Sequence, residues 1–494
     1  MKNAKFPFRY LFSVALFVAM VAPVVLAQEP APQATPPPPA APRSVLLPKP
    51  VERTLANGLR VIVVGRPGTP LVAVQMLVRN GAEVDPPELA GLANMTAGLL
   101  TKGTAERSAT QIAEDVEALG ASIESFTRFD ASRVNLNAMS SKIAPALAIM
   151  AEVVKRPAFS NEELDRLRQL TLDDLTVELS DPGTIGAYVA SRVVFGDTPY
   201  GQPLNGTPES IARIKRDDLL KYHSQFYRPD NAVLIFGGDI KPVQAFRLAQ
   251  QLFGDWKKPV AALPVVAAPK LGDTQPQVLV IDKPDAGQAA VLVARTGIDR
   301  NHPDYFRGLV TNSVLSGYSG RLNQEIRIKR GLSYGARSAL DMRRFTGPFS
   351  ASAQTKNQSA AEVASLLMDE VKKLGTAPVP DIELEPRKAV VIGNFGRNLE
   401  TAAGLVHQVG LLALYGIGLD EINRYVANVQ AITAGDVQKF SSTRLGAQGV
   451  NTIIVGNAKE FLPELTKIYP SVKVIPVAEL DLNSALLKKK QPVE

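Results

Sequence analysis

Runs of alternating apolar and polar residues, rich in Val and Ile, recur along the chain and predict β-strands. Two such runs, VIVVGRPGTPLVAVQMLVRNGA (61–82) and VLVIDKPDAGQAAVLVARTGI (278–298), each contain a Pro-bearing turn and an alternating strand that ends near Gly. Apolar residues at helical spacing predict amphipathic helices over 107–119, 142–155, 161–179, 358–374 and 419–431. The mixture predicts an α+β fold, with a largely antiparallel sheet and helices packed on one face.

The two halves of the chain repeat one another at a nearly constant distance. Pro67 and Pro284 lie 217 positions apart, and MAEVVK (150–155) matches MDEVKK (368–373) at 218. AVLIFGGD (232–239) resembles NTIIVGNA (451–458) at 219. A steady offset over separate places indicates a duplication. We therefore predict two homologous units, residues 50–262 and 272–478, joined by a Pro/Ala-rich linker at 263–276 that suits two rigid bodies.

The N-terminus has the pattern of a secretory signal peptide, residues 1–27. Lys2, Lys5 and Arg9 precede an apolar run from Tyr10 to Leu26, and Ala27 is a small residue suited to cleavage. We expect a secreted, periplasmic protein without stable membrane insertion after cleavage; an uncleaved anchor is the alternative. Residues 28–49, rich in Pro and Ala, are expected to form an extended linker. In the basic tail 479–494, the segment LLKKKQPVE (486–494) is expected to be disordered, with contact to acidic lipid headgroups as the alternative.

Composition excludes several kinds of chemistry. The chain has 494 residues and no cysteine, so it has no disulfide, thiol nucleophile or thiolate metal site. Its three histidines, His223, His302 and His407, are isolated in sequence, whereas a catalytic zinc takes three protein ligands. The formal charge of +7 falls to +4 without the signal peptide, which is too weak to indicate nucleic-acid binding. No G-x-S-x-G elbow is present either, which disfavours an unrelated hydrolase.

The segment GLANMTAGLLTKGT (91–104) resembles the metal-binding helix of the insulinase–pitrilysin–mitochondrial processing peptidase family. The family pattern is G-L-A-H-x-x-E-H-x-x-x-K-G-T, an inverzincin motif. The frame of this motif is kept, but Asn94, Ala97 and Gly98 stand where the resemblance places His, Glu and His. An amide is a poor zinc donor, Ala97 cannot move a proton, and Gly98 has no side chain. The helix register matches the family's third ligand to Asp174, which we expect to be a solvated helix residue.

The second half keeps a different family signature. LSGYSGRLNQEIRIKRGLSYGARSA (315–339) resembles the C-terminal-domain segment in which an Arg and a Tyr face the zinc site of the opposite domain. These residues are Arg327 and Tyr334 here. The resemblance implies that Tyr334 donates to the oxyanion and that Arg327 binds a peptide carbonyl. Ordinary helix and strand positions are the alternative for both residues.

The resemblance, which covers most of 50–478, implies half of a clamshell that pairs with a homologous subunit. The predicted function is a non-catalytic subunit that binds no cofactor itself and completes, with Arg327 and Tyr334, the site of a partner with an intact H-x-x-E-H motif. The zinc would lie in that partner, and the substrates would be peptides or unfolded proteins. A structural or binding scaffold of the same fold, without a peptidase partner, is the alternative.

Overall fold

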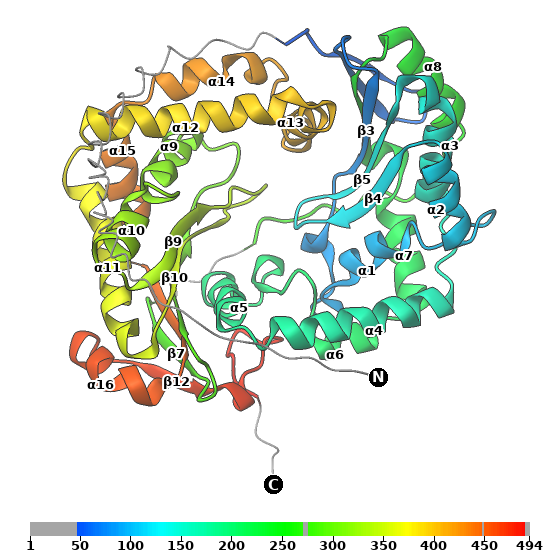
Figure 1. Ribbon diagram of the computed structural model, residues 1–494. Helices are drawn as coiled ribbons and strands as arrows, with labels where there is room; N and C mark the ends of the chain where they lie inside the picture. Colours follow the sequence, from blue (N-terminus) through cyan, green and yellow to red (C-terminus); the bar gives the residue numbers. More distant parts are fainter. Residues whose placement is uncertain (1–46, 270–274, 447–448, 490–494) are drawn as a thin grey trace, which may run out of the picture. The chain divides into compact units, whose positions relative to one another are not determined.

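The computed structural model describes residues 47–269, 275–446 and 449–489 (Figure 1). The predicted signal peptide and most of the adjoining linker lie outside these residues. The described residues fall within one compact unit. Within the described residues, no helix is both long enough and apolar enough to cross a membrane.

The first half of the chain builds a six-stranded sheet in the order β1-β2-β6-β3-β5-β4. Only β2 and β6 pair in parallel, and the other neighbours are antiparallel. The central strand β6 is buried along its whole length because both faces of the sheet are covered there, which explains its unbroken apolar sequence. The strands are β1 (Val51–Thr54), β2 (Arg60–Gly65), β3 (Leu71–Val78), β4 (Ser122–Thr127), β5 (Ser132–Met139) and β6 (Ala232–Gly238).

The second half repeats this sheet in the order β12-β7-β11-β8-β10-β9. Each inner strand occupies the place of its counterpart in the first sheet, as the sequence repeat predicts. The outer strand differs: β12 comes from the end of the chain and pairs in parallel with β7, whereas β1 pairs antiparallel with β2. The strands are β7 (Val278–Asp282), β8 (Ala289–Thr296), β9 (Ser333–Leu340), β10 (Pro348–Thr355), β11 (Asn451–Gly456) and β12 (Lys473–Pro476).

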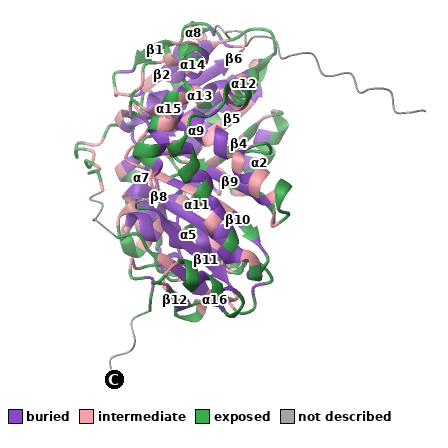
Figure 2. Ribbon diagram, turned by 90° about the vertical axis from the view of Figure 1, so that its left-hand side faces the viewer, coloured by how far each residue is buried: buried purple, intermediate pink, exposed green. Residues whose placement is uncertain are grey.

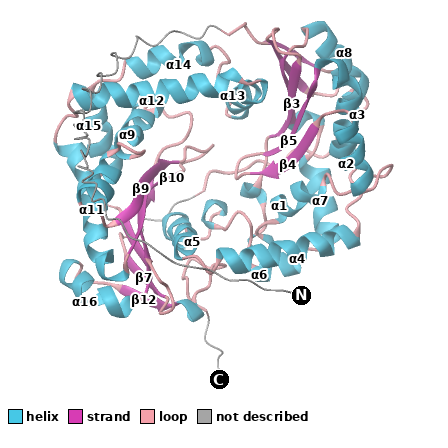
Figure 3. Ribbon diagram, in the orientation of Figure 1, coloured by secondary structure: helices cyan, strands magenta, loops and turns pink. Residues whose placement is uncertain are grey.

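Helices follow the strands in both halves (Figure 3), and all five predicted helices are present within about two residues of their expected ends. The helices of the first half are α1 (Leu92–Leu99), α2 (Ala109–Ala118), α3 (Ile143–Lys155), α4 (Asn161–Glu178), α5 (Pro182–Phe195), α6 (Pro208–Arg213), α7 (Arg216–Phe226) and α8 (Pro242–Phe253). Those of the second half are α9 (Tyr305–Leu315), α10 (Arg321–Asn323), α11 (Ala360–Thr376), α12 (Asp381–Glu400), α13 (Ala402–Leu414), α14 (Glu421–Gln430), α15 (Ala434–Phe440) and α16 (Ala458–Ile468), with π-helical turns at Gln324–Lys329 and Ser441–Leu445.

The two halves exchange one helix each. On one face of the first sheet lie the helices of its own half, and on the other face lies α13 of the second half, whose Val406 and Val409 pack with Leu77 and Ile235. Reciprocally, α5 of the first half packs its Val189 on the second sheet, whose strands β8 and β11 are largely buried (Figure 2). The α+β class with two like units is confirmed.

Two sequence expectations need correction because of this exchange. Helices were expected on one face of each sheet, but a helix of the other half covers part of the second face. The halves were also expected to behave as two rigid bodies on a linker. Instead, each half completes the apolar core of the other, because the exchanged helices bury sheet residues that would otherwise be exposed.

The basic tail is ordered in its described part, contrary to the expectation of disorder. Leu482 and Leu487 are buried in the core around α5. The guanidinium of Arg192 donates to the carbonyl of Leu482 at 2.8 Å, and the backbone N–H of Ala485 donates to Asp197 at 2.8 Å. Residues 480–489 are therefore held against the first half by apolar packing and by backbone hydrogen bonds.

Candidate functional site

A buried carboxylate sets the position of the degenerate helix α1. Asp85 accepts hydrogen bonds from the backbone N–H groups of Gly91 at 3.0 Å and Ala93 at 2.9 Å, at the first turn of the helix. Burial raises the pKa of Asp85 well above its ordinary value, and the two helix N–H groups oppose this. Gly91 has φ 92°, and a Cβ there would lie 3.0 Å from the carbonyl of Asn205. The hydrogen bonds to Asp85 and the backbone conformation of Gly91 thus fix the position of the first turn of α1.

The three positions that replace the zinc motif have different surroundings. The amide of Asn94 is half-buried and donates to the side-chain oxygen of Asn205 at 3.4 Å. Ala97 is fully buried. A Cβ at Gly98 would lie 3.1 Å from a methyl carbon of Leu167 on α4, so Leu167 borders the space that an imidazole at this position would need. The loss of ligands is accompanied by apolar packing against the helix.

A short hydrogen-bond network leads away from Asn94. Asn205 donates to Glu178 at 3.1 Å, and the hydroxyl of Tyr188 on α5 donates to the same carboxylate. Burial, and then the hydrogen bond to Glu178, raise the pKa of Tyr188. The carboxylate joined to the degenerate helix is therefore Glu178, which the sequence comparison did not single out. Asp174, one turn earlier on α4, is exposed.

These residues do not fit a catalytic zinc ion. Asn94 supplies an amide and Gly98 supplies nothing, and within the described residues no group of three or more His, Asp or Glu side chains could hold a metal. His223 of α7 is half-buried and hydrogen-bonds the carbonyl of Val154 at 2.9 Å, and desolvation lowers its pKa to about 4. It is part of the core and not a ligand.

Arg327 and Tyr334 lie together in the second half. Arg327 belongs to the π-helical turn Gln324–Lys329, and Tyr334 is the second residue of β9. The guanidinium carbon of Arg327 lies 5.3 Å from the ring centre of Tyr334 and 5.5 Å from that of Tyr318. Tyr334 is 93% exposed and Tyr318 is 72% exposed. Two exposed rings thus lie near one guanidinium. Because the rings are exposed, their burial contributes little to the stability of the fold. Sequence analysis missed Tyr318.

A groove of about 740 Å³ begins beside Tyr334. It runs between the first turn of α5 and the face of β9 and β10, where Gln354 donates to Asp181 at 3.3 Å. The free edge of β9 is closed to another strand at two positions, because the N–H of Ala336 donates to Asn323 and the N–H of Ser338 donates to Ser316. An extended chain in this groove would therefore contact side chains and not the β9 edge at these positions.

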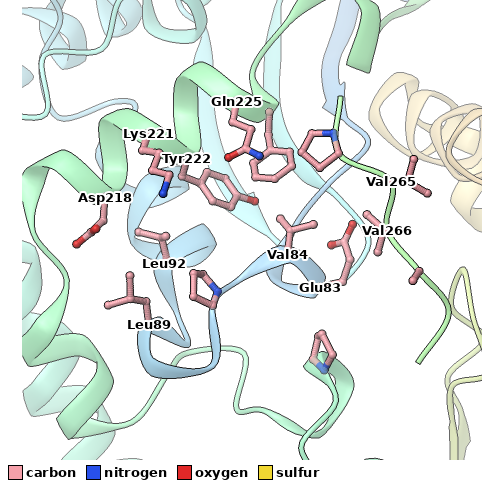
Figure 4. A pocket seen from close by; sticks show the side chains of 15 residues that line it. Glu83, Val84, Leu89, Leu92, Asp218, Lys221, Tyr222, Gln225, Val265 and Val266 are labelled. Atoms are coloured by element: carbon pink, nitrogen blue, oxygen red, sulfur yellow. The ribbon is translucent and has the colours of Figure 1, made fainter. Parts of the chain in front are cut away.

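A second pocket, of about 420 Å³, lies beside the start of α1 (Figure 4). Its walls come from α7, from the turn before α1 and from linker residues such as Val265, and Glu83 stands in its wall. None of the degenerate motif positions, Asn94, Ala97 and Gly98, lines it. The pocket is thus separate from the former metal helix.

The fold and site define a peptidase-like protein whose metal helix lacks its ligands, and comparisons with known proteins agree. Residues 60–204 match the family model "Insulinase (Peptidase family M16)", and residues 213–390 match "Peptidase M16 inactive domain". The chain belongs to the M16 peptidase family.

Curated relatives and solved structures are similar over most of the chain. An uncharacterized zinc protease of Mycobacterium tuberculosis is 25% identical over 83% of this chain and 94% of its own length. The uncharacterized zinc protease YmxG of Bacillus subtilis is 23% identical over 70% and 84%. The crystal structure of a peptidase M16 inactive domain from Pseudomonas fluorescens has a TM-score of 0.77 and 26% identity, over 82% of this chain and 98% of that one. A protease from Helicobacter pylori has the same fold, with a TM-score of 0.78 over 83% and 100%.

Proposed function

We propose that this chain is the non-catalytic subunit of a heterodimeric zinc metallopeptidase. Its partner would be a homologous subunit with an intact H-x-x-E-H motif, and the substrates would be peptides or unfolded proteins. The observation that carries the proposal is the contrast between the two site segments. The metal helix has lost its ligands and is packed by Leu167, whereas Arg327 and Tyr334 are kept together with the tyrosine 93% exposed.

The chemistry of the pair suits a site supplied by another chain. The Tyr334 hydroxyl can donate a hydrogen bond to an oxyanion, and Arg327 can bind a peptide carbonyl. Cation–π contacts with two rings restrict the Arg327 side chain, so less entropy is lost when it binds. Neither residue needs a metal in its own chain. We place the assembly in the periplasm or another secreted space because of the signal-like N-terminus.

The test is co-expression with a homologous chain that carries H-x-x-E-H, followed by a peptide-cleavage assay. We expect no cleavage by this chain alone, cleavage by the pair, and a turnover that falls by roughly 10²–10³ at most in the pair with Tyr334→Phe. Tyr318→Phe is the matched control, since it removes a hydroxyl on the other side of the same guanidinium and should leave turnover unchanged.

Two results would contradict the proposal. Equal effects of the two substitutions would mean that Tyr334 has no special role. If no such chain copurifies from the native host, and no combination cleaves peptides, the protein is a scaffold of the same fold.

A further inference from the structure

The face of the first sheet on which α13 packs also carries polar side chains. Along β5, Val134 and Leu136 point into the core of the first half's own helices, so Arg133 and Asn135 lie on the opposite face. Arg133 pairs with Leu77 of the neighbouring strand β3, so the two side chains lie on the same face. Leu77 packs in the core that includes α13, and this is therefore the face that α13 covers. Polar residues therefore lie on the face that α13 covers: Gly410 of α13 packs directly against the Oε1 atom of Gln75, the partner of Asn135 in the sheet.

Arg133 is buried without a partner. Its side chain is 5% exposed, and its Nε atom is buried with no hydrogen-bond partner. Within the described residues, the buried Nε of Arg133 has no hydrogen-bond partner and no carboxylate forms an ion pair with its guanidinium. Burial also lowers its pKa, as expected for a cation that has lost its water. Natural proteins rarely leave a guanidinium in this condition.

The charges around Arg133 leave a positive excess. Arg128, an exposed residue of the β4–β5 turn, repels it, and Asp130 and Tyr415 act in the opposite direction. His407 keeps an exposed edge on α13, and its pKa is lowered by the packing around its ring and then by the charges of Arg133 and Arg128.

Asp130 cannot serve as the missing partner, because both of its oxygens are engaged. Its Oδ1 accepts from Tyr200, and its Oδ2 accepts from the Arg344 N–H at 2.7 Å and from Tyr415 at 3.1 Å. The acid on β4, Glu124, accepts from Asn135 at 2.9 Å. Glu124, an exposed acid on the same face, keeps its second oxygen without a partner among the described residues, but no described carboxylate forms an ion pair with Arg133.

Amide groups lie next to this positive centre. Asn135 is two residues along β5 on the same face and accepts from the amide of Gln75 at 2.9 Å. The Oε1 atom of Gln75 is buried under Gly410 of α13 and lacks a hydrogen-bond partner, so it is not a ligand-binding group. These amides are engaged with one another, with Glu124 or with α13, so the group suited to a planar carboxylate is the guanidinium fork of Arg133 itself.

We propose that Arg133, with Arg128 and His407 beside it, is a binding site for a peptide carboxylate, either an acidic side chain or a C-terminus. The proposal rests on the proposed function in that the ligand is a peptide. It adds that this subunit selects among substrates by charge, at a place distinct from Arg327 and Tyr334. The ligand's carboxylate would form an ion pair with the guanidinium of Arg133, which has none within the described residues.

The experiment measures peptide binding to the full mature chain by isothermal titration calorimetry. The probes are an acetylated and amidated hexapeptide with one central Asp, the same peptide with Asn, and the Asn peptide with a free C-terminus. We expect the carboxylate-bearing probes to bind about tenfold more tightly than the neutral peptide, the difference that one charge-assisted contact supplies. Arg133→Met should abolish the difference, and Arg128→Gln should reduce it. Arg247→Gln, an exposed arginine of α8, is the control.

Thermal unfolding separates a binding role from a structural one. Because a buried unpaired cation is unfavourable, Arg133→Met should raise the Tm while it removes the discrimination. A lower Tm with unchanged discrimination would overturn the proposal, as would equal binding of the three probes or tighter binding of inorganic phosphate than of any peptide. Since these measurements need no partner subunit, their result is independent of whether the pair cleaves peptides.

Discussion

The backbone N–H of Arg344 donates a 2.7 Å hydrogen bond to the carboxylate of Asp130, which lies 214 residues earlier in the chain. The guanidinium of Arg344 also donates to the carbonyls of Arg79 and Asp130, at 2.6 and 3.0 Å. Tyr200 and Tyr415 donate to the same carboxylate from other elements. Asp130 therefore joins segments of both halves at one buried point, in addition to the two exchanged helices.

Asp130→Ala should destabilise the protein strongly. The substitution leaves the hydroxyls of Tyr200 and Tyr415 and the N–H of Arg344 without their acceptor, and each unsatisfied buried group costs about 1–3 kcal/mol. We expect a loss of at least about 3 kcal/mol, measured by chemical unfolding. Asp285→Ala removes an exposed carboxylate and should leave the midpoint nearly unchanged. Equal effects of the two substitutions would contradict the role of Asp130.

The stability should depend on pH through Glu83. Burial raises the pKa of Glu83 from 4.5 to about 7, against the opposing effect of Arg344. Because the folded state then holds its proton more tightly than the unfolded state, this group's contribution is full below pH 4.5 and is lost as the pH rises to about 7. The loss is on the order of 3 kcal/mol. Wild type and Glu83→Gln should therefore differ in Tm by an amount that changes over this range.

The Tm of the wild type must be compared with that of Glu83→Gln at each pH, because titration of His223 changes the stability in the direction opposite to that of Glu83. Its pKa is lowered from 6.5 to about 4, so its contribution is present above pH 6.5 and is lost as the pH falls through 4. Subtracting the Glu83→Gln profile from that of the wild type cancels this term. A difference that is flat between pH 4.5 and 7.5 would show that Glu83 titrates normally.

Restoring the zinc motif by itself should fail. An imidazole at Gly98 meets Leu167, whose methyl carbon already lies 3.1 Å from the position of a Cβ there. We expect Asn94→His/Ala97→Glu/Gly98→His to lose about 1–3 kcal/mol of stability through overpacking and to retain no stoichiometric zinc. Adding Leu167→Ala should recover part of the Tm. Stoichiometric zinc in the triple variant at unchanged Tm, by metal analysis and calorimetry, would show that the space exists.

The halves should not fold separately. Residues 42–262 without α13 expose Leu77 and Ile235, and residues 275–489 without α5 expose Leu292 and Val455. We expect each half to aggregate or to bind a hydrophobic dye when expressed alone, and the two to form a soluble complex when co-expressed. Monodisperse, cooperatively unfolding single halves would indicate that the exchanged helices contribute little.

The local pattern of apolar and polar residues was enough to predict the strands of the repeated sheets and the main helices. The period-two runs at 61–82 and 278–298 became β2–β3 and β7–β8, because alternation along a strand is a local consequence of having one buried face. The same holds for α3 and α11, whose apolar spacing matched their buried stripes. The described part of the tail was misjudged because a Lys-rich composition says nothing about distant partners such as Asp197.

By itself, the sequence determined the family, the duplicated α+β units and the absence of zinc ligands, since the letters at positions 94, 97 and 98 decide which donor atoms exist. Only the tertiary structure decided that α5 and α13 are exchanged, that Leu167 packs against the former metal helix, and that Arg133 is buried without a partner. The physical reason is that donor chemistry belongs to a single residue. Burial and pairing depend instead on segments brought together from far apart in the chain.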